Sequence, residues 1–390
     1  MVSTFSQLRT PAIVFGENRS GEAGSHLKPG TRHVLIIIGG KSHLNNRSYS
    51  LLVDSVEKTG CTISFEKIDK EPRPDDIDRI TGKAVYHDVD AVIVAGGGSV
   101  LDAGKAVSAM LPVQEPVKEY LEGVGTKKHS GVKRFFIAVP STSGTGSEAT
   151  SNAVLSQTGE NGFKRSLRHE NFVPDIAIVD PLMTVGCPSE ITASSGMDAF
   201  TQLLESYVSL KANPLTDALA LEGIAKIHEN LVKAVVNGDN VQARSGMSFA
   251  ALLSGITLAN AGLGLIHGFA SSVGALLDIP HGTVCGTLMG VVNRFNIESL
   301  LNQPEVSIAQ HKYAAVGRLL SGVPDKELTW YMKYVAAYIE NLTQQLNLKR
   351  LGEYGLKISD LDKIASATDH KANPVKFTRD AMVSMLTERI

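Results

Sequence analysis

The sequence has few cysteines, little net charge and no long uninterrupted apolar run, and each shortage excludes a class of protein. Its three cysteines, Cys61, Cys187 and Cys285, are far apart in a chain of 390 residues and form no CxxC pair. This spacing excludes a disulfide framework and indicates a reducing compartment, so we expect a cytoplasmic protein. The net charge of −2 favours neither nucleic acid nor an anionic membrane surface as a partner.

The hydrophobic segments do not indicate secretion or a membrane span. The N-terminal segment MVSTFSQLRT has no apolar core, so no secretory signal is visible. The most apolar long stretch, 249–266, is interrupted by serine, glycine, threonine and asparagine, and this favours a buried core helix. With 43% hydrophobic residues the chain has ample material for a core, and its length favours two domains.

Short apolar runs rich in β-branched residues recur through the first half of the chain. They lie at 34–38, 91–95, 135–139 and 176–179, with a weaker run at 62–66. Helical-looking segments separate the first four. Runs without strict alternation are typical of parallel strands that are covered on both faces. The pattern therefore predicts an open, doubly wound α/β domain.

Helical periodicity dominates from about residue 191 onward. Apolar residues over 200–208 are spaced to form one face of a helix. The segment 252–266 predicts a buried helix, and 325–347 predicts another long helix. We place the change between residues 181 and 190. The sequence thus predicts an α/β domain over 1–185 and an all-α helical domain over 186–390.

Two polar turns follow neighbouring predicted strands. The strand at 91–95 runs directly into three glycines and Ser99, after which a helix begins. Glycines let a backbone approach a ligand, and a helix N-terminus offers free N–H groups, so this turn could hold a pyrophosphate. The segment PSTSGTGSEAT at 140–150 could grip the same cofactor with hydroxyls and amides. A tight strand–helix turn and an ordinary polar loop are the alternatives.

A stripe of polar side chains lies on the helix after residue 190. At about 100° per residue the stripe contains Asp198, Gln202, Glu205 and Ser209, and Ser194 or Ser195 would cap the helix. The stripe could also be the solvated face of an amphipathic helix.

Two later histidines could bind a metal ion together with residues of that stripe. We expect His267 at the end of a buried helix and His281 in a turn or at the next helix start. Each could instead be a hydrogen-bonded structural histidine. Spacing alone does not decide between these interpretations.

Six motifs together resemble one family. In chain order they are GGGSVLDAGKA, PSTSGTGSEAT, FVPDIAIVDP, GMDAFTQLLESYVS, GLGLIHGFASSVGALLDIPHG and ANPVKFT. They span nearly the whole chain and resemble the iron-containing, or group III, alcohol dehydrogenases, which are related in fold to glycerol dehydrogenase and dehydroquinate synthase. The resemblance implies a dinucleotide-binding α/β domain, a helical domain for metal and substrate, and an active site in the cleft between them. It also implies hydride transfer between a nicotinamide and an alcohol/aldehyde pair.

The resemblance assigns a metal site with two departures. The family binds its metal with an aspartate and three histidines, which fall on Asp198, Gln202, His267 and His281. Gln202 therefore stands in place of a histidine, either as a weak fourth ligand or as a hydrogen-bond donor to the bound oxygen. Another family histidine, near the substrate, falls on Ser271, which is then the candidate proton relay. We expect a divalent ion, iron or zinc.

The resemblance also bears on the cofactor. Gly39 stands where family members that prefer NAD have an aspartate, and Gly40, Lys41 and Ser42 follow. Without that carboxylate a 2′-phosphate is not repelled, so we favour NADP(H) over NAD(H), although the segment could simply be a flexible turn. The other implied cofactor positions are Gly97, Gly98, Ser99, Asp102, Thr142, Thr145, Ser147 and Lys164.

The expected function is metal-assisted oxidation of a small primary alcohol or reduction of its aldehyde. An aldehyde or keto acid with an anionic tail, of the phosphonate or maleylacetate type, is an alternative, with Arg165 or Arg168 holding the tail. A lyase similar to dehydroquinate synthase and a non-catalytic protein that has lost its metal are further alternatives. We expect a homodimer or larger homo-oligomer and neither a nucleic-acid nor a membrane partner.

Overall fold

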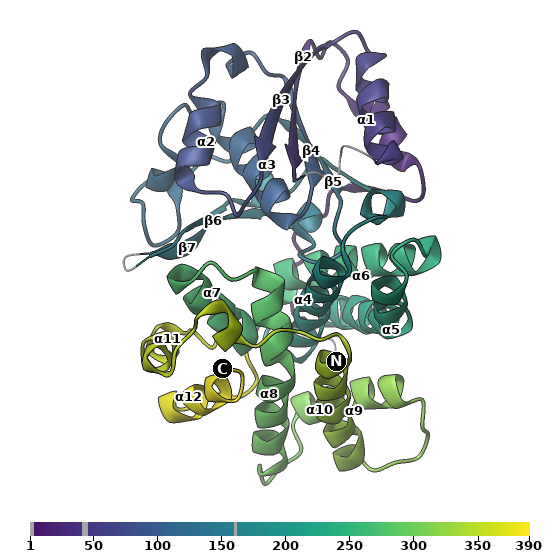
Figure 1. Ribbon diagram of the computed structural model, residues 1–390, viewed down its shortest axis with the longest axis vertical. Helices are drawn as coiled ribbons and strands as arrows, with labels where there is room; N and C mark the ends of the chain where they lie inside the picture. The colour runs from purple at the N-terminus through teal and green to yellow at the C-terminus, as the bar shows by residue number, and fades with distance from the viewer. Residues whose placement is uncertain (1–3, 41–45, 160–161) are drawn as a thin grey trace.

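The computed structural model describes residues 4–40, 46–159 and 162–390. It has a sheet-containing part built from the first half of the chain and a helical part built from the second half (Figure 1). The predicted fold class is confirmed. Strands give way to helices between Val179 and Ser189, and the division into two domains at 185/186 stays a prediction.

A six-stranded parallel sheet forms the centre of the first part. All five predicted runs are strands, and the sheet gains one short strand near the N-terminus that the sequence analysis missed. The order is β1-β8-β5-β4-β2-β3. The bounds are β1 Ala12–Phe15, β2 His33–Gly39, β3 Thr62–Ile68, β4 Ala91–Gly96, β5 Phe135–Pro140 and β8 Ile176–Val179. The direction of winding reverses between β2 and β4, and ligands bind at the carboxyl ends of strands at such a point.

Alternate residues of the central strands face two separate apolar cores. Val34 and Ile36 of β2 pack with α1 on one face, whereas Leu35 and Ile37 pack with α2 and α3 on the other. Figure 1 shows α1 on one side of the strands and α2 and α3 on the opposite side. These helices are α1 Arg47–Glu57, α2 Pro74–Thr81 and α3 Gly98–Met110.

An antiparallel hairpin lies between the sheet and the helical part (Figure 1). It consists of β6, Asn152–Gln157, and β7, Phe163–Arg168. Its contacts reach α3 on one side and α7 on the other. This hairpin was not predicted from the sequence, because β6 mixes apolar with polar residues and β7 mixes apolar with charged ones.

Nine α-helices follow among the described residues, and one of them is central. They are α4 Ser189–Val208, α5 Pro214–Val236, α6 Val241–Ala261, α7 Leu265–Leu276, α8 His281–Leu301, α9 Ile308–Ser321, α10 Leu328–Gln345, α11 Leu361–Ala367 and α12 Arg379–Thr387. α4 packs against α5, α6 and α8, and Phe200 and Leu203 on it are fully buried. It begins at Ser189 after Pro188, so the predicted cap at Ser194 or Ser195 is wrong.

The segment predicted as one buried helix over 252–266 is broken. α6 ends at Ala261 and α7 begins at Leu265, and the two helices meet at 97°. Gly262 carries a φ of 71°, a conformation that glycine adopts at no steric cost. His267 therefore lies in the first turn of α7 and not at the end of a long helix. No single helix of the described chain is long and apolar enough to cross a membrane; α6 and α7 meet that criterion only as this bent pair.

Candidate functional site

Asp198, His267 and His281 come together from three helices. They lie on α4, in the first turn of α7 and at the start of α8. Oδ1 of Asp198 is 3.4 Å from Nε2 of His267 and 3.8 Å from Nε2 of His281. Asp198 is 1% exposed, and Gln202 and Glu205 on the same stripe are also buried. The stripe is therefore not a solvated helix face.

This cluster fits a divalent cation. Oδ1 of Asp198 is buried and accepts no hydrogen bond from any described residue. Ligand nitrogen and oxygen atoms at zinc-like bond lengths and a tetrahedral angle would lie about 3.3 Å apart, close to the two distances above. A carboxylate and two imidazoles are also the donor types that such ions bind.

Glu205 fixes the orientation of His267. Its Oε2 lies 2.6 Å from Nδ1 of His267, and its Oε1 accepts a hydrogen bond of 2.7 Å from the amide of Ile266. A side chain at Gly264 would come within 2.9 Å of Oε1, so glycine is needed for this approach. With Nδ1 held as the donor, the lone pair of Nε2 points to Asp198.

The electrostatics of the cluster also favour a bound cation. Burial alone would lower the pKa of His267, but Cys285 and Glu205 beside it raise that pKa well above its usual value. Burial opposes ionisation of Asp198, yet the nearby histidines His281 and His267 bring its pKa below the ordinary value. Both shifts favour positive charge beside an ionised Asp198, and a bound metal ion could supply that charge in place of a proton.

Gln202 contacts Asp198 through its amide nitrogen. Nε2 donates to Oδ2 of Asp198 at 3.2 Å, and Oε1 accepts a hydrogen bond of 2.7 Å from Ser254. In this arrangement Gln202 orients Asp198, and its role as a metal ligand stays a prediction.

Cys285 joins the cluster, which the sequence analysis did not predict. Its Sγ is 3.7 Å from Nε2 of both His267 and His281. One donor atom from each of these residues and one from Asp198 all lie within 4.8 Å of one another. Burial raises the pKa of the Cys285 thiol to about 12. The signal available in the sequence was the four-residue spacing from His281.

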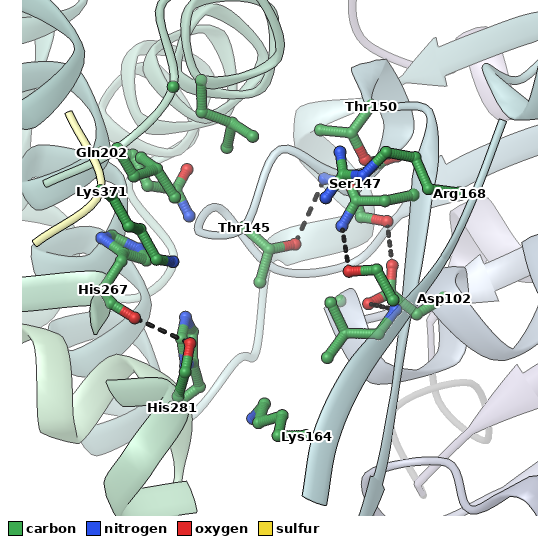
Figure 2. A pocket seen from close by; sticks show the side chains of 18 of the residues that line it. Asp102, Thr145, Ser147, Thr150, Lys164, Arg168, Gln202, His267, His281 and Lys371 are labelled. Carbon is green, nitrogen blue, oxygen red and sulfur yellow. Dashed lines mark hydrogen bonds between the residues drawn. The ribbon is translucent and has the colours of Figure 1, made fainter. Parts of the chain in front are cut away.

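A cavity of about 480 Å³ connects this cluster to the sheet edge. Figure 2 shows Gln202, Lys371, His267 and His281 on one side of it, and Asp102, Ser147, Thr150 and Arg168 on the other. The predicted cofactor, metal and proton-relay positions that line the cavity are Gly98, Ser99, Asp102, Thr145, Ser147, Lys164, Gln202, His267, Ser271 and His281. The structure thus brings most of the predicted cofactor and metal positions to one cavity.

The glycine turn packs against the Ser/Thr loop. Gly97 precedes the first residue of α3. An added Cβ would lie 3.3 Å from Oγ1 of Thr142 at Gly97 and 2.6 Å from Oγ1 of Thr145 at Gly98. The two turns therefore form one surface at the helix N-terminus, as a phosphate site requires.

A buried lysine that the sequence analysis missed holds this surface together. Nζ of Lys105 donates to Ser147, Thr150 and Asn152 at 2.7–3.0 Å. Burial lowers the pKa of Lys105 to about 8. Asp102, one turn earlier on α3, accepts from Ser147 and from the amide of Val154.

Gly39 ends strand β2 beside this surface, and Gly40 follows in a turn. An added Cβ at Gly39 would lie 2.3 Å from Cγ2 of Val100, so packing requires glycine there whatever the cofactor. Gly40 has a φ of 58° and no neighbour within 4 Å of an added Cβ. Lys41 and Ser42, the predicted phosphate-binding pair, lie outside the described residues.

Two other predicted side chains are engaged near the metal cluster. Nζ of Lys164 lies 2.6 Å from Oε1 of Glu71. The hydroxyl of Ser271 donates to the carbonyl of His267 at 2.9 Å. Both line the cavity, and their roles at the ribose and in proton relay stay predictions.

Several basic side chains also line the cavity. Arg168 is among them and pairs with Glu122 at 2.8 Å, whereas Arg165 lines a second hollow outside it. Lys211 and Lys371 line the same cavity, and neither forms an ion pair within the described ranges. Lys371 was not singled out in the sequence, although it directly precedes the motif ANPVKFT.

Comparisons with known proteins agree with this architecture. Residues 10–181 match the family model described as iron-containing alcohol dehydrogenase, and residues 192–390 match the C-terminal model of the same family. The 1,3-propanediol dehydrogenase of Klebsiella pneumoniae is 33% identical over 311 residues, 78% of this chain and 76% of that protein. The sulfoacetaldehyde reductase of Bilophila wadsworthia is 32% identical over 326 residues, 81% of each chain. A crystal structure of 1,3-propanediol oxidoreductase aligns over 100% of both chains with a TM-score of 0.88 at 27% identity.

The parallel sheet and the helical part of this chain have the arrangement of that solved oxidoreductase structure. This chain belongs to the iron-containing alcohol dehydrogenase family. The family assignment decides against the lyase alternative.

Proposed function

We propose that the protein reduces a small aldehyde to its primary alcohol, and catalyses the reverse reaction, with a nicotinamide cofactor and a divalent ion. One observation carries the proposal: a single cavity joins the turn at Gly98 to the cluster of Asp198, His267 and His281. A hydride donor on the sheet side would therefore face a carbonyl group on the cluster side.

The cluster suits the charge that develops in this reaction. A divalent cation lowers the pKa of an alcohol hydroxyl and polarises an aldehyde carbonyl. Asp198, His267 and His281 would hold it, and one carboxylate with neutral imidazoles leaves net positive charge for an alkoxide. Glu205 keeps Nε2 of His267 directed inward. Ser271, on the cavity wall, is our candidate for relaying the proton.

We favour NADP(H) as the cofactor. Neither Gly39 nor Gly40 carries a carboxylate that would repel a 2′-phosphate, and Lys41 follows in the sequence. Packing against Val100 is a second reason for glycine at position 39. Whatever the reason for the glycine, the position has no acidic group to repel a 2′-phosphate. We also expect a homodimer or larger homo-oligomer, which light scattering coupled to size-exclusion chromatography would measure.

An aldehyde with an anionic tail is the second candidate substrate. The observation that favours it is that Lys211 and Lys371 both line the cavity and form no ion pair with the residues that the structure describes. Arg168 lies on the opposite wall (Figure 2). A carboxylate, sulfonate or phosphonate would provide the missing counter-charge. A related protein, as noted above, is named for sulfoacetaldehyde.

Following the absorbance of NADPH and NADH with a panel of aldehydes tests both candidates. The panel pairs each neutral aldehyde with one of the same length that ends in a carboxylate, sulfonate or phosphonate. Aldehyde-dependent oxidation of reduced cofactor supports the proposal, and the more efficient member of each pair identifies the substrate class. Cofactor binding without turnover of any aldehyde or alcohol would contradict it.

A further inference from the structure

We propose that Cys285 is a ligand of the ion held by Asp198, His267 and His281, so that the site consists of one carboxylate, two imidazoles and one thiolate. The resemblance to the family places a histidine in the fourth position, and this chain has Gln202 there. The inference rests on the proposed function only in requiring that an ion occupies the cluster. It adds a second anionic donor. With Asp198 and a thiolate both bound, a divalent ion would keep no net charge and would polarise a carbonyl group more weakly than with Asp198 alone.

The distances around Cys285 are those of a tetrahedral site. At zinc-like bond lengths, a thiolate sulfur and an imidazole nitrogen lie about 3.6 Å apart across a tetrahedral angle. The observed distances from Sγ to Nε2 of His267 and to Nε2 of His281 are both 3.7 Å. The distances from Asp198 to the same two nitrogens, 3.4 and 3.8 Å, fit the same polyhedron. Four of the six donor–donor distances therefore match one tetrahedral site, and all four donor atoms lie within 4.8 Å of one another.

The surroundings of the sulfur are not those of an ordinary core cysteine. A free buried cysteine usually packs as a small hydrophobic side chain. Cys285 is fully buried, yet its sulfur faces two imidazoles and a carboxylate. His281 and Cys285 are four residues apart on α8, so they share one face of that helix. α8 thus presents two donors to the ion.

Gln202 is poorly placed to be the fourth ligand. Its oxygen accepts a hydrogen bond from Ser254, and its NH₂ group donates to Oδ2 of Asp198. That contact occupies Oδ2. Oδ1, which accepts no hydrogen bond within the described part of the chain, is left facing the cluster. Gln202 therefore orients a ligand, and Cys285 supplies the donor that the missing histidine would have given.

A thiolate changes which metal the site prefers. Thiolate sulfur is a soft donor that suits zinc and cobalt, whereas a set of imidazoles and carboxylate also serves iron. We expect the wild-type protein, dialysed against equal concentrations of Zn²⁺ and Fe²⁺ without oxygen, to retain mainly zinc. Cys285→Ser should retain a smaller ratio of zinc to iron.

Cobalt absorption spectroscopy of the full-length protein tests the ligand directly and does not depend on turnover. The protein is stripped of metal and titrated with Co²⁺. We expect a near-ultraviolet charge-transfer band from thiolate to cobalt that saturates at one ion per chain. Cys285→Ser should lose the band, and Cys61→Ser, a change at a cysteine outside the cluster, should keep it. If circular dichroism shows that Cys285→Ser does not fold, Cys285→Ala replaces it in the experiment.

The outcomes separate this inference from the proposed function. Cobalt bound with visible ligand-field bands but no charge-transfer band would overturn the Cys285 ligand and leave the metal-assisted function standing. No cobalt binding by the wild-type protein would overturn both. Gln202→Ala should keep the band and bind cobalt about 10–100-fold more weakly, as expected for loss of an outer hydrogen bond. A band that survives in Cys285→Ser would also overturn the inference.

Discussion

Oε2 of Glu205 and Nδ1 of His267 lie 2.6 Å apart, joining the last turn of α4 to the first turn of α7. The same carboxylate accepts the amide of Ile266, so one side chain both caps α7 and sets the ring orientation of His267. The direction of a proposed metal ligand is thus fixed by the helix packing itself.

Glu205→Gln should weaken metal binding by about 10–100-fold, the usual cost of losing an outer-sphere partner. The carboxylate accepts hydrogen bonds from both Ile266 and His267, and an amide has one oxygen, so one donor would face an NH₂ group. Titration with a chromophoric chelator would measure the affinity, with the exposed Glu305→Gln as the control. Equal affinities in the two variants would show that Glu205 has no influence on the ion.

Gln202→His should raise the iron content of the purified protein, because an imidazole would complete the family's ligand set. The variant also loses the hydrogen bonds of the amide to Asp198 and Ser254, so some loss of thermal stability should accompany the gain. Elemental analysis of protein grown with added iron gives the result. Unchanged iron content would mean that position 202 does not reach the ion.

Gly39→Asp should move cofactor preference from NADPH toward NADH only when Val100 is shortened as well. The Cβ of the aspartate would otherwise lie 2.3 Å from Cγ2 of Val100. For Gly39→Asp with Val100→Ala, we expect the ratio of kcat/KM for NADPH to that for NADH to fall about tenfold, roughly 1.4 kcal/mol. Val100→Ala alone is the control. The same ratio in the double variant and in Val100→Ala would show that the end of β2 does not lie at the ribose of the cofactor.

Lys371→Gln should raise KM for an aldehyde with an anionic tail by about tenfold, or roughly 1.4 kcal/mol, and leave KM for its neutral counterpart unchanged. The side chain lines the cavity on the same side as His267 (Figure 2). Added salt should reduce the difference, since it screens the ionic attraction. The exposed Lys233→Gln is the matched control. Equal changes for both substrates would exclude a role in binding the tail.

The sequence predicted the elements that depend on local patterns. Uninterrupted apolar runs such as 91–95 are buried parallel strands, and the periodicity over 200–208 is a helix. It did not predict β7, whose Lys164 and Arg168 face the cavity in place of the apolar residues typical of a strand. It also missed the bend after Ala261, because glycines inside an apolar run do not by themselves show where a helix ends.

The main residues of the candidate site were predicted from the sequence, but the contacts that orient them were not. The resemblance to the family supplied Asp198, His267 and His281. The roles of Glu205 and Cys285 depend on how α4, α7 and α8 pack, which no spacing along the chain encodes. Lys105 was missed for the same reason, since its partners lie more than forty residues away.

The central claim is that Asp198 helps to hold an ion on which hydride transfer depends. The most direct test is kcat of Asp198→Ala, loaded with the metal found in the wild-type protein and assayed with the preferred aldehyde and cofactor. We expect kcat to fall by about 10³-fold or more, because the ion contributes several kcal/mol to stabilising the transition state. Cofactor affinity should stay within about twofold of wild type, because the substitution does not touch the sheet edge. The exposed Asp325→Ala should keep full activity. Turnover of Asp198→Ala near the wild-type rate would contradict the account.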